Sequence, residues 1–423
     1  MRKWYSLIDK VYRMENLEKS FKAVKANKGA PGIDGETIEA FEANLSKNLQ
    51  KLHEELKTGT YQPQPVKRTY IEKEDGSLRP LGIPAIRDRV SQQALKNVLE
   101  PIFDPEFHPS SYGYRPGKSC QHAIAKAERF MNKYGLAYVA DMDLSKCFDT
   151  LDHELIIRAV NKKVSDGKIL NLVKQFLKSG VAEDGVVSGT EIGAAQGGPI
   201  SPLIMNIYLD EFDQKMKEQG IRIVRYADDI LVFGRSRKQA GKFMAKAVEI
   251  LEKDLKLKVN REKTHITSVQ QGVPYLGVII REKWISIHPK RIKRFKDKIR
   301  KLTIRNQGRN LEKVINELNP VMRGWVNYFR IANCKGLLEE LMGWIRRRLR
   351  MKKMKEWKTW KALHKQLRRM GYTGNYEKIS VTRWRNSASP LINMALPNEW
   401  FDSLKLFDMT KMEVGILFRY YEQ

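Results

Sequence analysis

The sequence predicts an α+β fold in which antiparallel strands and helices are followed by a helical, strongly basic region and a small C-terminal domain. Two observations predict the sheet. Short apolar runs flank Tyr226-Ala227-Asp228-Asp229, and another apolar run covers residues 137–144. A third observation predicts the helical region, because apolar side chains recur at helical spacing among lysines and arginines over residues 291–302.

The other elements follow in chain order from periodicity and turn signals. We expect helices over residues 5–56 with a glycine loop at 28–35, a hairpin of residues 66–71 and 78–83, a helix at 87–103, a helix opened by residues 196–202, a helix at 240–255, two apolar stretches at 258–266 and 275–280, and helices at 311–318, 321–329 and 337–349. Gly197 and Gly198 precede one of these helices, where they would let the backbone approach a ligand.

Composition indicates a polyanionic partner. The chain has 423 residues, enough for roughly two to four domains, and a formal net charge of +29. Residues 290–369 hold 26 lysines and arginines against 6 aspartates and glutamates, which is more than a solvated surface requires. The three cysteines are widely spaced and indicate neither a disulfide framework nor a zinc site. Since no apolar run approaches the ~20 residues of a membrane span, we expect a cytoplasmic protein without membrane contact.

Two adjacent acids mark the turn of the predicted hairpin around residue 228. Asp228 and Asp229 repel each other at such a turn, and a cation usually neutralises a pair of this kind. Hard carboxylate oxygens favour Mg²⁺ over a softer metal. An ordinary polar turn is the alternative, and the Asp-Asp pair alone does not exclude it.

The acids of the upstream strand favour a cation site over an ordinary polar turn. Asp141 and Asp143 are two residues apart, so in a strand they share one face while Met142 points to the other. Nucleotidyl transfer by two metal ions requires carboxylates that converge from different strands, with the ions about 4 Å apart. Asp143, Asp228 and Asp229 would supply this set as catalytic residues and as ligands of two Mg²⁺ ions, for which Mn²⁺ could substitute.

These residues resemble the palm of a reverse transcriptase, in which Tyr-Ala-Asp-Asp follows a strand and an aspartate precedes the Phe148-Asp149 pair. Residues 107–117, 196–203 and 323–329 more specifically resemble the maturase/reverse transcriptases encoded in group II introns, and the resemblance spans roughly residues 20–350. It implies a right-hand polymerase with fingers and palm over residues 1–285, including an N-terminal extension over about 1–60, a helical thumb or maturase X domain over 286–370, and a DNA-binding domain over 371–423.

The resemblance also implies nucleotide contacts. Lys73 and Arg79 flank the turn of the first hairpin and would hold the triphosphate of a deoxynucleoside triphosphate, although basic residues at hairpins are common. Phe148 would exclude a 2′-hydroxyl, or it is simply a core residue. Gln196 would lie beside the template base and the nucleotide sugar, and Lys263 is a candidate general acid toward pyrophosphate.

Contacts to the RNA template and primer are expected from basic and aromatic residues. Arg115 lies in a loop that interleaves tyrosines with basic residues, although core tyrosines closing a loop would explain it almost as well. The remaining candidates are Tyr226 in the palm and, in the basic helices, Arg291, Arg294, Arg346, Arg347 and Arg348.

Residues 371–423 carry 6 basic and 6 acidic residues, which is a departure from a DNA-binding domain. Several of its runs suggest strands, and target-DNA contact would rest on Arg383, Trp384 and Arg385. We expect no endonuclease domain after it.

The prediction is an RNA-directed DNA polymerase that also binds its parent group II intron RNA and promotes splicing and mobility. We expect it in a bacterial ribonucleoprotein with that RNA, and a homodimer is open. The alternatives are a retron, diversity-generating or defence-associated reverse transcriptase, and an RNA-binding splicing factor with an inactive palm.

Overall fold

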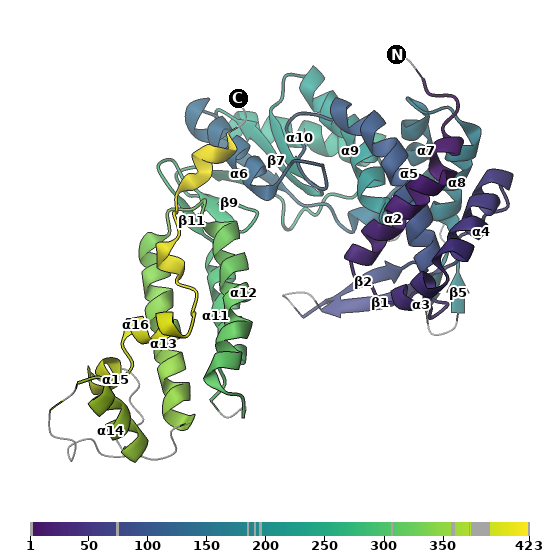
Figure 1. The fold of residues 1–423 in the computed structure, drawn as a ribbon. Helices are drawn as coiled ribbons and strands as arrows, with labels where there is room; N and C mark the ends of the chain where they lie inside the picture. The colour runs from purple at the N-terminus through teal and green to yellow at the C-terminus, as the bar shows by residue number, and fades with distance from the viewer. Residues whose placement is uncertain are drawn as a thin grey trace. The chain divides into compact units, whose positions relative to one another are not determined.

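The computed structural model describes residues 3–72, 76–183, 186–189, 192–193, 197–305, 308–356, 360–371, 373 and 390–421. The chain divides into two compact units, Met1–Ser268 and Val269–Gln423 (Figure 1). Among the described residues, no helix combines the length and apolar character that crossing a bilayer requires.

Four helices open the first unit, as predicted: α1 (Ile8–Tyr12), α2 (Met14–Ala26), α3 (Ile38–Ala43) and α4 (Leu45–Thr58). The glycine loop between α2 and α3 packs on the start of α5 (Ile86–Phe103). A Cβ on Gly32 would lie 2.6 Å from the Ala85 Cα, and the Arg89 guanidinium donates to the carbonyls of Ala30 and Pro84. The glycines therefore allow close packing of the loop on α5.

A four-stranded sheet lies beside these helices, in the order β2-β1-β4-β5. β1 (Val66–Glu72) and β2 (Leu78–Ile83) form the predicted antiparallel hairpin, and β1 also pairs in parallel with β4 (Val181–Glu183). β5 (Val186–Ser188) closes the opposite edge. Of the nucleotide-contact candidates, Lys73 and Gln196 lie outside the described residues.

The central sheet is antiparallel throughout, in the order β6-β7-β3-β8. Its strands are β3 (Tyr138–Met142), β6 (Ile223–Tyr226), β7 (Asp229–Gly234) and β8 (His265–Ser268). α10 (Arg237–Glu249) packs across β7, β3 and β8, and α6 (Cys120–Glu128) packs against β6. Ala140, Met142 and Ile230 enter the core, so the acids that alternate with apolar residues on β3 point to the opposite face.

The helices beside this sheet match the prediction in place, with shifted ends. α9 (Ser201–Glu218) begins where the glycine-containing segment was expected to open a helix, and α10 continues into a π-turn over Ile250–Asp254. α7 (His153–Asn161) and α8 (Gly167–Lys178) complete the first unit, with α7 packed against α9.

The second unit begins with a small sheet, β9 (Val273–Tyr275), β10 (Val278–Ile280) and β11 (Ile285–Ile287). Tyr328 donates to the Leu276 carbonyl at 2.8 Å, and the Ile285 amide donates to Asn333 Oδ1 at 2.9 Å. These bonds tie the sheet to the helices that follow, so contacts divide the chain earlier than the predicted boundary after residue 285.

Three long helices follow: α11 (Pro289–Leu302), α12 (Leu311–Phe329) and α13 (Lys335–Glu356), with α12 packed against both others (Figure 1). α12 was expected as two helices separated at Pro320, and that expectation is wrong. Val314, Leu318, Met322 and Val326 are all buried at helical spacing across the proline. Packing of this continuous apolar face outweighs the loss of one backbone hydrogen bond.

The remainder of the second unit is helical where it is described. α14 (Trp360–Arg369), α15 (Pro390–Ala395) and α16 (Asn398–Ser403) are followed by 3₁₀ turns at Met409–Lys411 and Ile416–Tyr420. No strand occurs in residues 390–421, and the expected strand-like runs between residues 374 and 389 lie outside the described residues. Asn319 on α12 fixes this segment by donating to the Lys405 carbonyl and accepting from the Phe407 amide, each at 2.8 Å. Arg383, Trp384 and Arg385 lie outside the described residues.

Candidate active site

A two-residue turn between β6 and β7 presents the adjacent acids. Tyr226 pairs with Asp229, which leaves Ala227 and Asp228 as the turn itself. Ala227 has a φ of 58°, a conformation that L-residues rarely adopt, and it is buried. Gly113 packs so closely beneath the turn that a Cβ on it would collide with the Ala227 amide nitrogen. We call residues 226–229 the catalytic turn.

The strand register brings the upstream acid to this turn. Asp141 pairs with Leu231 and Met142 pairs with Ile230, so the next position along the same ladder sets Asp143 opposite Asp229. Residues opposite each other in adjacent strands share a face of the sheet. The register therefore directs Asp143 and Asp229 to one face of the central sheet, and the joint binding of metal by Asp143, Asp228 and Asp229 stays a prediction.

The pKa shifts of these acids show that their charges interact. Burial and the neighbouring Asp143 raise the pKa of Asp228, while the charges of Arg79 and Arg225 oppose that rise. Burial, followed by repulsion from Asp228, Asp141 and Asp143, raises the pKa of Asp229 to about 7.

This concentration of carboxylates fits a hard divalent cation. The carboxylate ligands suit such a cation, but no coordination site is preformed in the described part of the chain. The described residues contain no group of three or more His, Cys, Asp or Glu in coordinating geometry. Asp141 adds a fourth carboxylate nearby, and burial raises its pKa to about 6. The acids are thus gathered on one face, and a bound cation would have to draw their oxygens together.

Two groups stabilise negative charge on Asp143. The Lys263 ammonium lies 3.5 Å from its Oδ2, and Asn260 Nδ2 donates to the same oxygen at 3.1 Å. The Asn260 amide also donates to the Asp143 carbonyl at 2.8 Å. Lys263 therefore lies beside Asp143, and its role as a general acid stays a prediction. The sequence carried no signal for Asn260, because its role depends on a contact between residues 117 positions apart.

Arg79 reaches the same site from the first hairpin. Its charge lowers the pKa of Asp228 and that of Tyr114, so it lies within electrostatic range of both. Tyr114 was noticed in the sequence only as part of an aromatic loop. Tyr114 is 53% exposed and has a φ of 57°, next to Gly113 in the chain. Asp228 and Asp229 both raise the Tyr114 pKa, after burial.

Phe148 lies in a 3₁₀ turn, Cys147–Thr150, directly after the Asp143 strand. Its ring is half-buried and packs against the palm core. Cys147 is buried, and burial with the charge of Asp228 raises its pKa to about 12, which places this turn beside the acids. A core contact and a contact to the nucleotide sugar are both compatible with this position.

The two glycines before α9 face protein atoms. Gly197 has a φ of 129°, and a Cβ there would collide with the Gly82 carbonyl at the end of β2. A Cβ on Gly198 would collide with the side chain of Gln92 on α5. These close approaches are to the hairpin strand and to α5, and the expected approach of a ligand to the glycine backbone stays a prediction.

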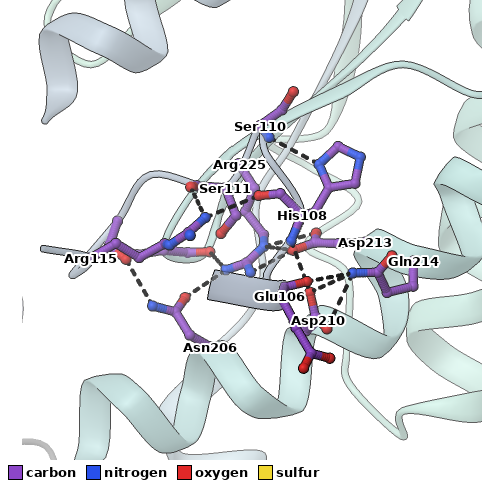
Figure 2. Close-up of polar contacts among 12 residues, drawn as sticks. Glu106, His108, Ser110, Ser111, Arg115, Asn206, Asp210, Asp213, Gln214 and Arg225 are labelled. Atoms are coloured by element: carbon purple, nitrogen blue, oxygen red, sulfur yellow. Dashed lines mark hydrogen bonds and ion pairs between the residues drawn. The ribbon is translucent and has the colours of Figure 1, made fainter. Parts of the chain in front are cut away.

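Arg115, predicted to contact the template, has a structural role (Figure 2). Its Nε donates to Asp104 Oδ1 and its Nη2 to the Asp104 carbonyl, each at 2.7 Å. Its Nη1 donates to the carbonyls of His108 and Ser111 at 3.0 and 2.8 Å. The side chain is 6% exposed, so the guanidinium closes its own loop and does not face a template.

Tyr226 is half-buried at the end of β6. Burial and a hydrogen bond with Cys120 raise its pKa. The Tyr226 ring packs against the buried core, and its predicted contact with template or primer stays a prediction.

Comparison with known proteins agrees with this geometry. Residues 71–280 match the family "Reverse transcriptase (RNA-dependent DNA polymerase)", and residues 292–371 match "Group II intron, maturase-specific domain". Over 310 residues the chain is 35% identical to Protein YkfC of Escherichia coli, a match that covers 64% of this chain and 81% of YkfC. It is 30% identical over 329 residues to the Group II intron-encoded protein LtrA of Lactococcus lactis subsp. cremoris. The chain belongs to the group II intron reverse transcriptase/maturase family.

The match to LtrA covers 62% of this chain and 54% of LtrA, so the chain spans about half of that relative. Among solved structures, a chain of a "Partial Cas6-RT-Cas1--Cas2 complex" is similar over 62% of this chain and 43% of its own length, with 23% identity and a TM-score of 0.38. The predicted α+β fold, the reverse transcriptase and the maturase function are confirmed at the level of the family. The maturase-specific match favours the intron lineage over the other reverse transcriptase lineages.

The arginines predicted to contact RNA in the maturase-specific region fall into two groups by their exposure. Arg346 Nη2 donates to Asp408 Oδ2 at 2.8 Å, and Arg348 Nε donates to Thr303 Oγ1 at 2.6 Å, with its guanidinium over the Trp344 ring. Arg346 connects α13 to the C-terminal segment, and the prediction that it faces nucleic acid is corrected. Arg348 connects α13 to the end of α11 and is only half-buried, so its RNA contact stays a prediction. Arg294 and Arg347 are exposed, whereas Arg291 is half-buried beside Gly277.

Proposed function

We propose that this chain copies RNA into DNA at a site where Asp143, Asp228 and Asp229 hold two Mg²⁺ ions. The observation that carries the proposal is the register of β3 with β7, which brings an acid from a distant segment to the two acids of the catalytic turn. Bound there, the ions would make the attacking 3′-hydroxyl easier to deprotonate and would neutralise the charge that develops on the leaving pyrophosphate. Mn²⁺, which prefers the same oxygen ligands, would substitute.

The protein groups around these acids orient the nucleotide. Arg79, which is exposed on β2 and within electrostatic range of Asp228, would hold the triphosphate together with Lys73. Phe148 would lie beneath the sugar and clash with a 2′-hydroxyl, while Gln196 would contact the sugar and the template base. Acceleration then comes from positioning and charge neutralisation, with the primer 3′-hydroxyl as the nucleophile.

Lys263 would donate a proton to the departing pyrophosphate. Its ammonium lies 3.5 Å from Asp143 and its side chain is largely exposed, which supports a contact with a phosphate held near the acids. A lysine beside a polyanion is chemically suited to this task.

The second unit would bind the template–primer duplex and the parent intron RNA. Residues 290–369 contain the charge concentration, and its remaining named candidates are the exposed Arg294 and Arg347 and the half-buried Arg291 and Arg348. Each neutralised phosphate releases counterions and adds affinity. We propose that the protein works in the bacterial cytoplasm in a ribonucleoprotein with this RNA, promotes its splicing, and extends a primer at a target DNA.

Primer extension on an RNA template tests the central assignment. Asp228→Asn should abolish product, while Glu249→Gln, a surface acid paired only with lysines, should extend at the rate of the unmodified chain. Both variants should bind the primer–template equally well. Extension by Asp228→Asn would contradict the assignment. Splicing of the parent intron, assayed in the same preparation, separates a polymerase from a splicing factor with an inactive palm.

A further inference from the structure

We propose that Arg225 is a positioning residue for the catalytic turn, anchored by Asp213 and Asn206 of α9. Arg225 immediately precedes Tyr226, yet its side chain points away from the substrate face into the palm. Arg225 and Asp213 are 0% exposed and Asn206 is 1% exposed. The inference rests on the proposed polymerase function, because it assigns a task to residues beneath that site.

The contacts of the guanidinium divide between α9 and the turn (Figure 2). Arg225 Nε lies 2.9 Å from both carboxylate oxygens of Asp213, and Nη2 donates to Asp213 Oδ2 at 2.6 Å. Nη1 donates to Asn206 Oδ1 at 3.0 Å and to the Ala227 carbonyl at 3.1 Å. One side chain thus connects a rigid buried helix to the backbone carbonyl directly before Asp228.

The turn requires such an anchor because its conformation is unfavourable by itself. Ala227 is held at a φ of 58°, which an alanine adopts only when its surroundings determine it. The direction of the Asp228 side chain follows from this backbone. A small rotation at Ala227 would therefore move the carboxylate that must meet Asp143.

Asn206 holds the turn by a second route. Its Nδ2 donates to the Gly113 carbonyl at 2.8 Å, and Gly113 is the residue packed against the Ala227 amide nitrogen. The same side chain therefore contacts Arg225 on one side and the supporting loop on the other. Asn206 is the point where both supports of the turn meet.

The loop is fixed in turn to β6 and α9. The Tyr112 amide donates to the Arg225 carbonyl and the Arg225 amide donates to the Ser110 carbonyl, each at 2.9 Å. The His108 amide donates to Asp210 Oδ1 at 3.1 Å, and Arg115 closes the loop behind it (Figure 2). The catalytic turn is thus bonded from below by α9 and from the side by residues 108–115.

A buried ion pair that contributes only stability is the alternative. Neutralising Asp213 requires one positive charge, and a lysine would supply it. The bonds from Nη1 to Asn206 and Ala227 go beyond neutralisation, and they depend on the planar, forked guanidinium. Arg225→Lys preserves the charge and loses this fork, so it separates the two roles if the variant folds.

Asn206→Ala is the decisive variant, because it leaves the Arg225–Asp213 pair intact and removes both of its own contacts. Tyr208→Phe is its matched control. Tyr208 lies two residues along the same helix and is 1% exposed. Its hydroxyl donates to the Leu255 carbonyl at 2.6 Å and accepts from the Asp152 amide at 3.4 Å, and neither bond goes to residues 226–229. Both variants lose buried hydrogen bonds from α9, so both should lower the melting temperature.

The measurements are melting temperature, primer–template Kd, single-turnover rate and Mn²⁺ binding by electron paramagnetic resonance. Asn206→Ala should lower the rate roughly 10- to 100-fold and weaken Mn²⁺ binding, with primer–template Kd unchanged. Tyr208→Phe should keep the rate and the Mn²⁺ affinity. Asn206→Asp, which keeps the acceptor for Arg225 but loses the donor to Gly113, should fall between them.

Three results would overturn the inference. The first is Asn206→Ala with normal rate and Mn²⁺ affinity. The second is an equal loss of rate in Tyr208→Phe at equal loss of melting temperature. The third is Arg225→Lys, folded, with an unchanged rate. Failure of the proposed function itself would show differently, as primer extension by Asp228→Asn.

Discussion

The Lys263 ammonium and the Asp143 carboxylate form an ion pair at 3.5 Å, and Asn260 donates to the same carboxylate oxygen. Both contacts stabilise negative charge on Asp143 before any cation is present. A cation arriving at Asp143 would compete with Lys263 for that oxygen. The lysine would then be free next to the place where pyrophosphate departs. Binding of the metal would in this way release Lys263 for its proposed role as the general acid.

This pair predicts that Lys263 matters for chemistry and little for stability. Its side chain is 69% exposed, so Lys263→Met should change the free energy of unfolding by less than about 1 kcal/mol. The rate of single-nucleotide incorporation should fall about 10²- to 10³-fold, because proton transfer is lost. Lys162→Met, which breaks the exposed Lys162–Glu211 pair at 3.1 Å, is the control and should keep its rate. Normal incorporation by Lys263→Arg would restrict Lys263 to a purely electrostatic role, since arginine does not release its proton.

Metal affinity should depend on pH through Asp229. Its pKa is raised to about 7, so below pH 7 the carboxyl is protonated in the metal-free protein and a cation must displace that proton. Mn²⁺ affinity measured by titration should therefore increase up to about tenfold per pH unit below 7 and level off above it. Asp141→Asn removes one of the repelling carboxylates, so it should shift the levelling-off to lower pH. An affinity that is constant between pH 6 and 8 would contradict the proposed role of Asp229.

Local patterns predicted the parts of the site that lie on single segments. The apolar runs around Asp228 and Asp229 required a hairpin, and the alternation over residues 137–144 required a strand with Asp141 and Asp143 on one face. Antiparallel pairing then left few ways to arrange them. The helix around Pro320 was mispredicted because proline was taken as the end of a helix. The buried apolar face that continues across Pro320 was not considered.

Contacts between distant segments could not be predicted in the same way. Asn260 and Asn206 are ordinary polar residues in the sequence, and only the fold brings them to Asp143 and Gly113. The charge of an arginine likewise does not tell which way it faces. Arg115 was therefore assigned to a template, although its partners are carbonyls and a carboxylate of its own loop.

Selection of deoxynucleotides should depend on the ring of Phe148. Phe148→Val removes the ring from the 3₁₀ turn beside Asp143, and use of ribonucleoside triphosphates should rise roughly 10- to 100-fold relative to deoxynucleotides. Leu151→Val is the control, because Leu151 is 0% exposed at the end of the same turn and also loses core volume. Equal discrimination in the two variants would leave Phe148 as a core residue only. The measurement is kcat/KM for matched ribo- and deoxynucleotides on one template.

Arg346 and Arg347 are adjacent on α13 and should behave in opposite ways. Arg346 is 12% exposed and pairs with Asp408, which is 11% exposed, so Arg346→Gln should cost about 1–3 kcal/mol of unfolding free energy. It should also open residues 404–421 to proteolysis, because the Asp408 pair helps hold that segment on the helices. Arg347 is exposed, so Arg347→Gln should leave both properties unchanged.

RNA binding should show the reverse order. Arg347→Gln should weaken binding to the parent intron RNA and reduce the slope of log affinity against log salt by roughly 0.7–0.9, the value for one lost phosphate contact. Arg346→Gln, measured where it is fully folded, should keep that slope, because its guanidinium is occupied by Asp408. If both variants lost the same slope, Arg346 would face the RNA after all, and its bond to Asp408 would have to break on binding. The salt dependence distinguishes these cases, since a destabilised but uninvolved arginine changes unfolding and leaves the number of released counterions unchanged.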